Sequence, residues 1–162
     1  MTQSQLQEQL RSLRLGHFAQ ALLQQQSQAT TYDEMSFEER LGLLAQHEIH
    51  CRQDSKVKRL LRQATLRLEA HASRLECRAG RGLRTDKVAT LLSGQYSHHA
   101  HNIIVTGATG CGKTYLACAL ARQACEQHHT ARYYRLGQLL DELNIGHADD
   151  SYRQQLAQLA KK

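Results

Sequence analysis

The strongest constraint on this chain is the octet from Gly107 to Thr114, which has the letters GATGCGKT. It matches the pattern G-x-x-x-x-G-K-[S/T] at all four fixed positions. Residues 102–106 before it form an apolar, β-branched run typical of a buried strand, and residues 115–127 after it have the pattern of a helix. Because a turn between a strand and a helix is the context in which this pattern holds phosphate groups, the sequence predicts a phosphate-binding loop.

Each residue type in the octet serves phosphate binding in a different way. Glycines let the backbone turn so that successive N–H groups point inward, and the following helix adds its partly positive N-terminus. Lys113 would place a charge on the β- and γ-phosphates of a nucleotide, and the hydroxyl of Thr114 would coordinate Mg²⁺. We therefore predict a nucleotide site, with Thr114 as its metal ligand, made of Gly107, Ala108, Thr109, Gly110, Cys111, Gly112, Lys113, Thr114 and Tyr115. The alternative is a glycine-rich connector in which the Lys-Thr pair is incidental.

Basic side chains gather in the segment that precedes this loop. The chain carries a net charge of +6, but between Cys51 and Lys87 eleven lysines and arginines stand against four acids, a local balance of +7. Such a concentration of one sign indicates a surface for nucleic acid. We predict contacts to DNA phosphates from Arg52, Lys56, Lys58, Arg59, Arg62 and Arg67. The alternative is a solvated helix face, which many runs of charge are.

Composition excludes several other classes of protein. No stretch approaches the roughly 18 apolar residues that a membrane span requires, and residues 1–10 are rich in glutamine where a signal peptide would be apolar. The five cysteines are an odd number without the spacing of a zinc site, so we expect reduced thiols and a cytoplasmic protein. Residues 98–101 hold three histidines, which we expect to lie in a polar loop rather than to bind a metal.

Local signals place the helices of the first part of the chain. Thr2 can cap a first amphipathic helix, and Gly16 separates it from a second, which we expect to end near residue 27. Residues 29–33 are expected to be a linker. Ser36 and Glu39 form a capping box that starts a long helix.

The second part of the chain mixes helical and strand-like patterns. A weaker helical pattern continues over residues 63–77 and is interrupted by a glycine-containing break at 79–83. A short helix is expected at 86–92, a second strand at 131–135, and then two helices, of which the last is capped by residues 149–151.

These elements predict the fold class. With strands at 102–106 and 131–135 joined through a helix, the chain would hold one right-handed βαβ unit. We therefore predict an α/β fold, in which residues 80–162 are the N-terminal part of a P-loop NTPase domain. Residues 1–79 are predicted to be an all-α, basic module for DNA binding and assembly.

Several stretches together resemble a known family. They are the run SFEERLGLL at 36–44, the end of the basic helix RLLRQA at 59–64, RGL at 81–83, the octet with the following YLACALA, and YYRL at 133–136. They resemble the IstB-type helper ATPases of bacterial insertion sequences, which are relatives of the DnaC helicase loaders. The resemblance runs from about residue 13 to the last residue.

The resemblance implies more than the residues alone. Members of that family are AAA+ proteins with an N-terminal helical domain, and they assemble on DNA with ATP and hand target sites to a transposase. By that resemblance, residues 107–114 would bind ATP and Mg²⁺. The implied partners are DNA, contacted mainly at its phosphate backbone, a cognate transposase, and further copies of the same chain.

Two departures from the family pattern affect the expected activity. Ala108 stands where the family usually has proline. The acidic Walker B element, the sensor residues and the arginine finger would lie beyond Lys162, and residues 149–150 are interpreted as a helix cap rather than as a substitute. We therefore assign no catalytic residues and expect binding without efficient hydrolysis. The alternatives are a DNA-binding module with a vestigial nucleotide site and a DnaC-like helicase loader.

Overall fold

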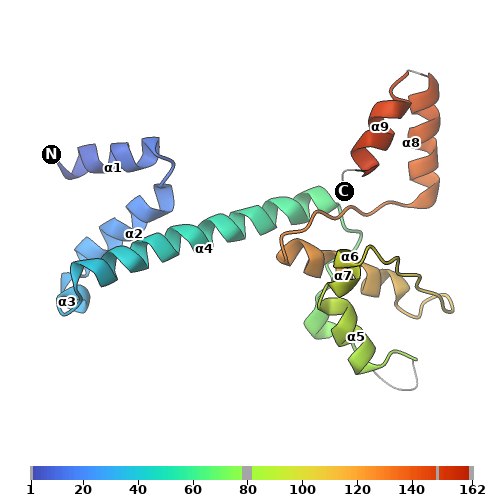
Figure 1. Cartoon of the computed structure of the whole chain (residues 1–162), viewed down its shortest axis with the longest axis horizontal. Helices are drawn as coiled ribbons and strands as arrows, with labels where there is room; N and C mark the ends of the chain where they lie inside the picture. The colour runs from blue at the N-terminus through green and yellow to red at the C-terminus, as the bar shows by residue number, and fades with distance from the viewer. Residues whose placement is uncertain (1, 78–81, 149, 161–162) are drawn as a thin grey trace. The chain divides into compact units, whose positions relative to one another are not determined.

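The computed structural model describes residues 2–77, 82–148 and 150–160 and divides the chain into two compact units. Unit 1 is Met1–Lys56 and unit 2 is Val57–Lys162, so the division falls within one long helix. Figure 1 shows the order of the elements. The module boundary predicted between residues 79 and 80 lies outside the described residues and stays a prediction.

Unit 1 consists of helices whose starts are visible in the sequence. It contains α1 (Gln3–Ser12), α2 (Gly16–Ser27), α3 (Ala29–Tyr32) and the first turns of α4 (Phe37–Ala64). Both predicted caps of this unit are confirmed. The Thr2 hydroxyl accepts from the Gln5 amide at 3.4 Å, and the Ser36 hydroxyl accepts from the Glu39 amide at 3.2 Å. The predicted linker at 29–33 is wrong, since α3 occupies most of it.

Unit 2 contains the remaining elements. They are the last turns of α4, a 3₁₀ turn η1 (Ala72–Arg74), α5 (Thr85–Leu92), α6 (Gln95–His98), α7 (Lys113–Glu126), α8 (Leu136–Ala148) and α9 (Tyr152–Ala160). The weaker helical pattern predicted over 63–77 is wrong, because α4 ends at Ala64 and Thr65 has a φ of 47°. A β-branched residue in this left-handed region cannot continue a right-handed helix.

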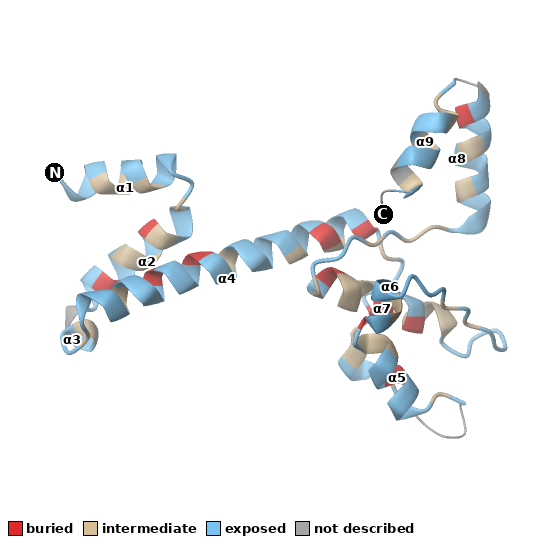
Figure 2. Ribbon diagram, viewed as in Figure 1, coloured by how far each residue is buried: buried red, intermediate tan, exposed pale blue. Residues whose placement is uncertain are grey.

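The core of unit 2 is built from small side chains around α7. One cluster joins Leu60 and Ala64 to Cys125, and a second joins Ala70 to Cys118 and Ala119. Ala64, Ala70, Cys118 and Cys125 have no exposed surface, and Figure 2 shows buried positions on α4 and α7. Burial raises the pKa of the Cys125 thiol, which keeps it protonated. Small residues at these positions let the chain before α5 approach the surface of α7 closely.

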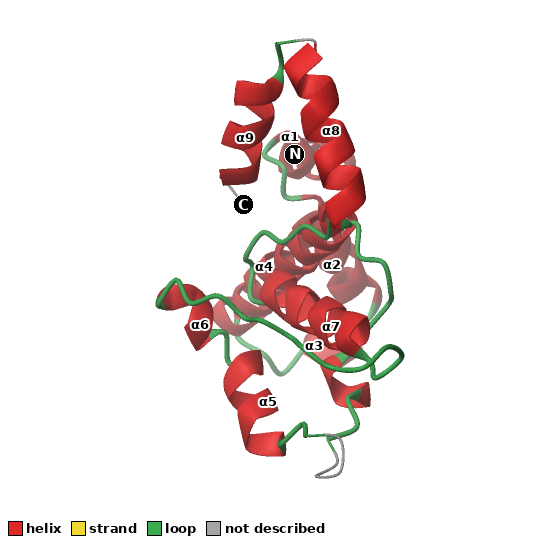
Figure 3. Ribbon diagram, turned by 90° about the vertical axis from the view of Figure 1, so that its right-hand side faces the viewer, coloured by secondary structure: helices red, strands yellow, loops and turns green. Residues whose placement is uncertain are grey.

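The predicted α/β class is wrong for this structure. No strand occurs in the described ranges 2–77, 82–148 and 150–160, and Figure 3 draws those residues as helices and loops alone. Residues 102–106 and 131–135 are both non-helical, and neither range is assigned as a strand. A strand is stabilised by its neighbours across a ladder, and here the amide of Tyr133 donates instead to the carbonyl of Ala64 at 2.9 Å. Ile104, predicted to be buried, is 86% exposed.

Among the described helices, none combines the length and apolarity that crossing a membrane would need. Of the predicted cap at 149–151, residue 149 lies outside the described residues. Ser151 stands immediately before α9, where its carbonyl accepts from the amide of Gln155 at 3.0 Å.

Candidate functional site

The octet forms a tightly curved loop in front of α7. Gly107, Gly110 and Gly112 have φ values of 153°, 82° and 93°, which residues with a side chain rarely adopt. A Cβ atom added at Gly107 would lie 2.9 Å from the Sγ of Cys111 on the other side of the turn. The glycines predicted to allow the turn are therefore used for that purpose.

Lys113 is held inside this loop by its own backbone. Its Nζ donates to the carbonyl of Gly107 at 2.8 Å and to the carbonyl of Ala108 at 2.7 Å. The Sγ of Cys111 lies 3.9 Å from the same nitrogen. An ammonium group has three N–H donors, so the two carbonyls fix its position and the third donor faces the weakly accepting Cys111 sulfur, which an anion could replace.

The start of α7 adds a second source of positive potential. Gly112 occupies the N-cap position and contributes no side-chain hydrogen bond, and no acidic residue lies in the first turn. The amide of Leu116 is bonded to the carbonyl of Gly112 at 3.0 Å, so the amides that precede it lie at the open end of the helix. A helix of 14 residues carries roughly half a positive charge at this end, which favours an anion there.

A cavity of about 500 Å³ adjoins the loop. Four residues of the predicted site line it: Cys111, Gly112, Lys113 and Tyr115. Its volume falls within the roughly 300–1,000 Å³ range of pockets that enclose small ligands. Gly107, Ala108, Thr109, Gly110 and Thr114 belong to the loop and to the first turn of α7, but not to the described lining of the cavity.

Sequence reasoning missed the other wall of this cavity. Arg74, Leu75 and Glu76 come from the segment at and after η1, and Gly82 and Leu83 come from the segment before α5. The only available signal was RGL at 81–83, which contributed to the family resemblance but had no assigned role. Residues this far from the octet are brought to it only by packing.

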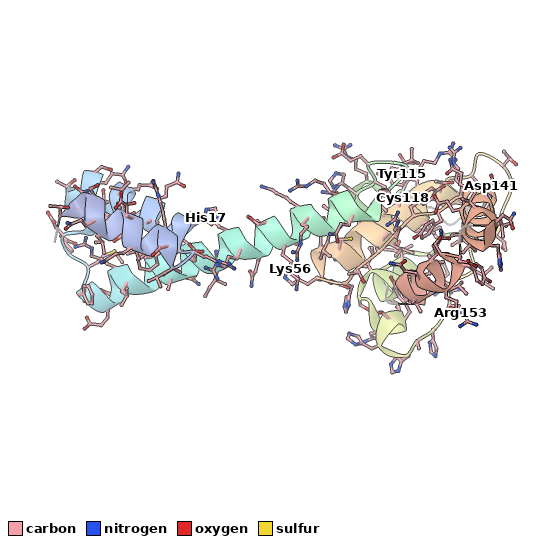
Figure 4. All side chains as sticks on the ribbon, turned by 90° about the horizontal axis from the view of Figure 1, so that it is seen from above. His17, Lys56, Tyr115, Cys118, Asp141 and Arg153 are labelled. Atoms are coloured by element: carbon pink, nitrogen blue, oxygen red, sulfur yellow. The ribbon has the colours of Figure 1, made fainter. Side chains whose placement is uncertain are left out.

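Tyr115 connects that wall to the loop. Its hydroxyl accepts from the amide of His71 at 3.3 Å and lies 3.5 Å from the His71 carbonyl. The ring also packs on the cluster of Ala70, Cys118 and Ala119, and Figure 4 labels Tyr115 and Cys118 on α7. Tyr115 therefore sets the distance between η1 and the start of α7.

The predicted DNA-binding residues have different surroundings. In unit 1, the Nε of Arg52 donates to the carboxylate of Glu48 at 2.6 Å, and its Nη2 donates to the carbonyl of Arg14 at 2.6 Å. The Arg52 side chain is thus already hydrogen-bonded within unit 1. Lys56 is exposed in the same unit.

The remaining predicted contacts to DNA lie in unit 2. Lys58, Arg59 and Arg62 are exposed on α4, and the four-residue spacing of positions 58 and 62 puts them on one face, roughly opposite the buried Leu60. The Nε of Arg62 donates to the carbonyl of Lys58 at 3.3 Å. Arg67 follows the end of α4 and lines a second cavity, which lacks the residues of the octet.

Comparison with known proteins decides the family. The family described as IstB-like ATP binding protein matches residues 8–162. The chain belongs to this IstB-like family. The resemblance predicted from the sequence is therefore confirmed, and it covers nearly the whole chain.

Individual relatives of this IstB-like chain carry similar names. A Pseudomonas fluorescens protein named as an ATP-binding protein of insertion sequence IS1162 is 45% identical over 99% of this chain and 69% of its own length. The insertion-sequence ATP-binding protein y4pL of Sinorhizobium fredii is 33% identical over 74% of this chain and 49% of its own length. An insertion-sequence protein of Mycobacterium tuberculosis is 26% identical over 96% of this chain and 62% of its own length. The chain thus spans about half to two-thirds of the length of these relatives.

Proposed function

We propose that this chain binds ATP at residues 107–114, as part of an ATP-binding helper protein of an insertion sequence. The observation that carries the proposal is the position of Lys113, whose ammonium group is held by two loop carbonyls inside a turn of three positive-φ glycines. Membership of the IstB-like family supports ATP as the nucleotide.

Each part of the site has a role in this proposal. Lys113 and the open amides of α7 would hold the β- and γ-phosphates. The adjoining cavity, with the apolar side chains of Leu75, Leu83 and Leu116 on its walls, would hold the base and the ribose.

Mg²⁺ would bind next to the phosphates. Thr114 lies in the first turn of α7 directly after Lys113 and is only partly buried. A hydroxyl and phosphate oxygens are hard ligands of the kind that Mg²⁺ prefers. The ion would neutralise part of the phosphate charge, while Thr114 holds its place at the loop.

The ATP proposal is tested by Lys113→Ala. The variant loses the ammonium charge and its charge-assisted hydrogen bond to phosphate, so we expect the affinity for a fluorescent ATP analogue to fall about tenfold or more. Lys87→Ala, which removes the same charge from an exposed position of α5, is the matched control and should bind like the wild type. Far-UV circular dichroism verifies that both variants are folded. Equal affinity of Lys113→Ala and wild type would refute the site.

We also propose that the chain binds the phosphate backbone of DNA through its basic segment, from Arg52 to Arg67. The exposed positions of Lys56, Lys58, Arg59 and Arg62 support this proposal, since their charges are free to meet solvent. Arg52 would contribute less, because it is bound to Glu48.

Salt dependence tests this second part. DNA affinity of the wild type should fall steeply as salt is added, and Arg59→Ala combined with Arg62→Ala should weaken binding several-fold and reduce the salt slope. Arg11→Ala combined with Arg153→Ala removes the same charge from α1 and α9 and serves as the control. A DNA affinity that does not change with salt would contradict the proposed contacts to phosphate.

The partners of the whole protein follow from the same family. We propose a cognate transposase, self-association and a cytoplasmic location, supported by the insertion-sequence names of the relatives. Size measurement of the purified chain with and without ATP and DNA tests self-association, and co-purification with a co-expressed insertion-sequence transposase tests the partner. A chain that stays monomeric with both ligands and retains no transposase would contradict these proposals.

A further inference from the structure

A second cavity in unit 2, of about 290 Å³, lies where the segment after α4 meets the start of α8. Three arginines line it, Arg67, Arg132 and Arg135, together with the rings of Tyr133 and Tyr134. Glu142 is the one acidic residue in its described lining. The cavity shares no described lining residue with the cavity beside the octet.

The charges around this cavity are not balanced. Arg67, Arg132 and Arg135 are all lining residues, and none of them forms an ion pair within the described parts of the chain. Arg135 directly precedes α8, and the first turn of that helix contains no acidic residue. Cations at a helix N-terminus are disfavoured by the helix dipole. An anion in the cavity would therefore relieve a repulsion that the chain itself leaves in place.

An aromatic ring stands next to this charge. The guanidinium carbon of Arg132 lies 5.3 Å from the centroid of the Tyr134 ring, within the range of a cation–π contact. Tyr134 and Tyr133 are both half-buried. A positively charged groove beside an aromatic ring is the combination with which proteins bind single-stranded nucleic acid, because the ring stacks on a base while the cations hold the phosphate.

The backbone around the cavity is held in place. The amide of Tyr133 donates to the carbonyl of Ala64 at 2.9 Å, and the amide of Leu139 donates to the carbonyl of Arg135 at 2.9 Å. Tyr133 also packs on the cluster of Ala70, Cys118 and Ala119. The arginines thus project from a supported segment, which lowers the ordering cost of binding.

We infer that this cavity holds one nucleotide of a DNA single strand, with the phosphate on Arg67, Arg132 and Arg135 and the base against Tyr134. The inference rests on the proposed DNA binding and adds a site to it. The volume is at the small end of ligand pockets, which suits a single nucleotide better than a whole ATP molecule. A single strand is required because bases stacked in a duplex do not offer their faces to a side chain.

Anisotropy of a labelled oligothymidylate at low salt tests the arginines. Arg132→Gln combined with Arg135→Gln should weaken binding about tenfold or more. It should also make the negative slope of log affinity against log salt shallower, by about 0.7 for each phosphate that is no longer neutralised. Arg11→Gln combined with Arg153→Gln makes the same change of charge outside the cavity, on α1 and α9, and Figure 4 labels Arg153. This control should lose far less affinity.

The ring is tested separately. Tyr134→Leu should weaken binding about tenfold, because the stacked base loses its partner, whereas Tyr134→Phe keeps the ring and should restore binding. A duplex of the same length should respond to neither substitution of Tyr134. Far-UV circular dichroism of Tyr134→Leu and Tyr134→Phe establishes that both fold alike.

The outcomes separate this inference from the proposed function. If the wild type binds the oligothymidylate and the Arg132/Arg135 variant matches its control, the cavity is overturned while DNA binding stands. Equal effects of Tyr134→Leu on single strand and duplex would overturn the single-strand assignment. Failure of the wild type to bind any DNA would overturn both, and would leave the ATP site of Lys113 untouched.

Discussion

The two units of the chain are stabilised by different chemistry. In unit 1 the buried side chains include Gln25 and Glu48, and the amide of Gln25 donates to the carbonyl of Arg40 at 3.2 Å. In unit 2 the buried clusters consist of alanines, cysteines and a leucine. Unit 1 therefore buries hydrogen-bonded polar side chains beside the apolar Ala19 and Leu44, whereas the buried clusters of unit 2 are apolar and pack around α7.

Glu48 shows most clearly how unit 1 is held. Its side chain is among the most buried of that unit, and its carboxylate accepts from the amide of Phe18 at 2.7 Å and from the Nε of Arg52 at 2.6 Å. These contacts join α4 to the start of α2. In unit 2, by contrast, the loop at 107–114 precedes a helix whose buried clusters contain no charged residue.

The largest expected effect is on the packing of unit 2. Ala119 is 1% exposed between Ala70 and Cys118, so Ala119→Leu forces extra atoms into a filled space and should destabilise unit 2 by about 1–3 kcal/mol. Ala117→Leu, at an exposed position of the same helix, is the control and should be near neutral. Urea unfolding followed by circular dichroism measures both. Similar urea midpoints for the two variants would show that unit 2 does not depend on close packing at Ala119.

A smaller effect is expected from the polar network of unit 1. Glu48→Gln removes the negative charge to which Arg52 and the Phe18 amide donate. The free energy of unfolding should fall by about 1–2 kcal/mol, and not by more, because Arg52 is half exposed and water partly replaces the lost interaction. ATP binding by unit 2 should not change. Hydrogen exchange resolves the two units, and protection lost in unit 2 as well as in unit 1 would contradict their independence.

The pH dependence of unit 1 sharpens the comparison further. Burial raises the pKa of Glu48, but hydrogen bonds from Arg52 and Phe18 and the charges of Arg52 and His17 outweigh it, so its pKa lies below the ordinary value of 4.5. Its contribution to stability is therefore present above about pH 4.5 and is lost as pH falls through the lowered pKa. The difference in free energy of unfolding between wild type and Glu48→Gln should be constant near pH 7 and should shrink as the pH falls into the acid range. A gap that widens in acid would mean that the pKa is raised instead.

Much of the local structure follows from the sequence because its causes are local. Thr2 and Ser36 cap the helices expected of them, since a cap involves residues only three positions apart. The same holds for the octet, where the turn depends on glycines within six residues of one another. Family membership was also readable, because it rests on short runs of residue types.

The errors lie where distant residues compete for the same groups. Residues 131–135 have the composition of a strand, but the amide of Tyr133 is taken by the end of α4. The predicted DNA contact of Arg52 stays a prediction, but its side chain is bound by Glu48, four residues earlier in the same helix, and by the carbonyl of Arg14. The residues beside Tyr133 do not indicate its bond to Ala64, whereas the Glu48–Arg52 pair has the four-residue spacing of a helix ion pair.

The sequence by itself determined the curved loop at 107–114, the starts of the first helices and the family, because each depends on neighbours along the chain. The tertiary structure decided that the described residues are helical without a sheet, and that Leu75 and Leu83 face the same cavity as Lys113. It also placed three arginines and Tyr134 around one hollow. The physical reason is that hydrogen-bond partners and charges far apart in the chain become neighbours only when small side chains such as Ala64 and Cys125 let the segments pack.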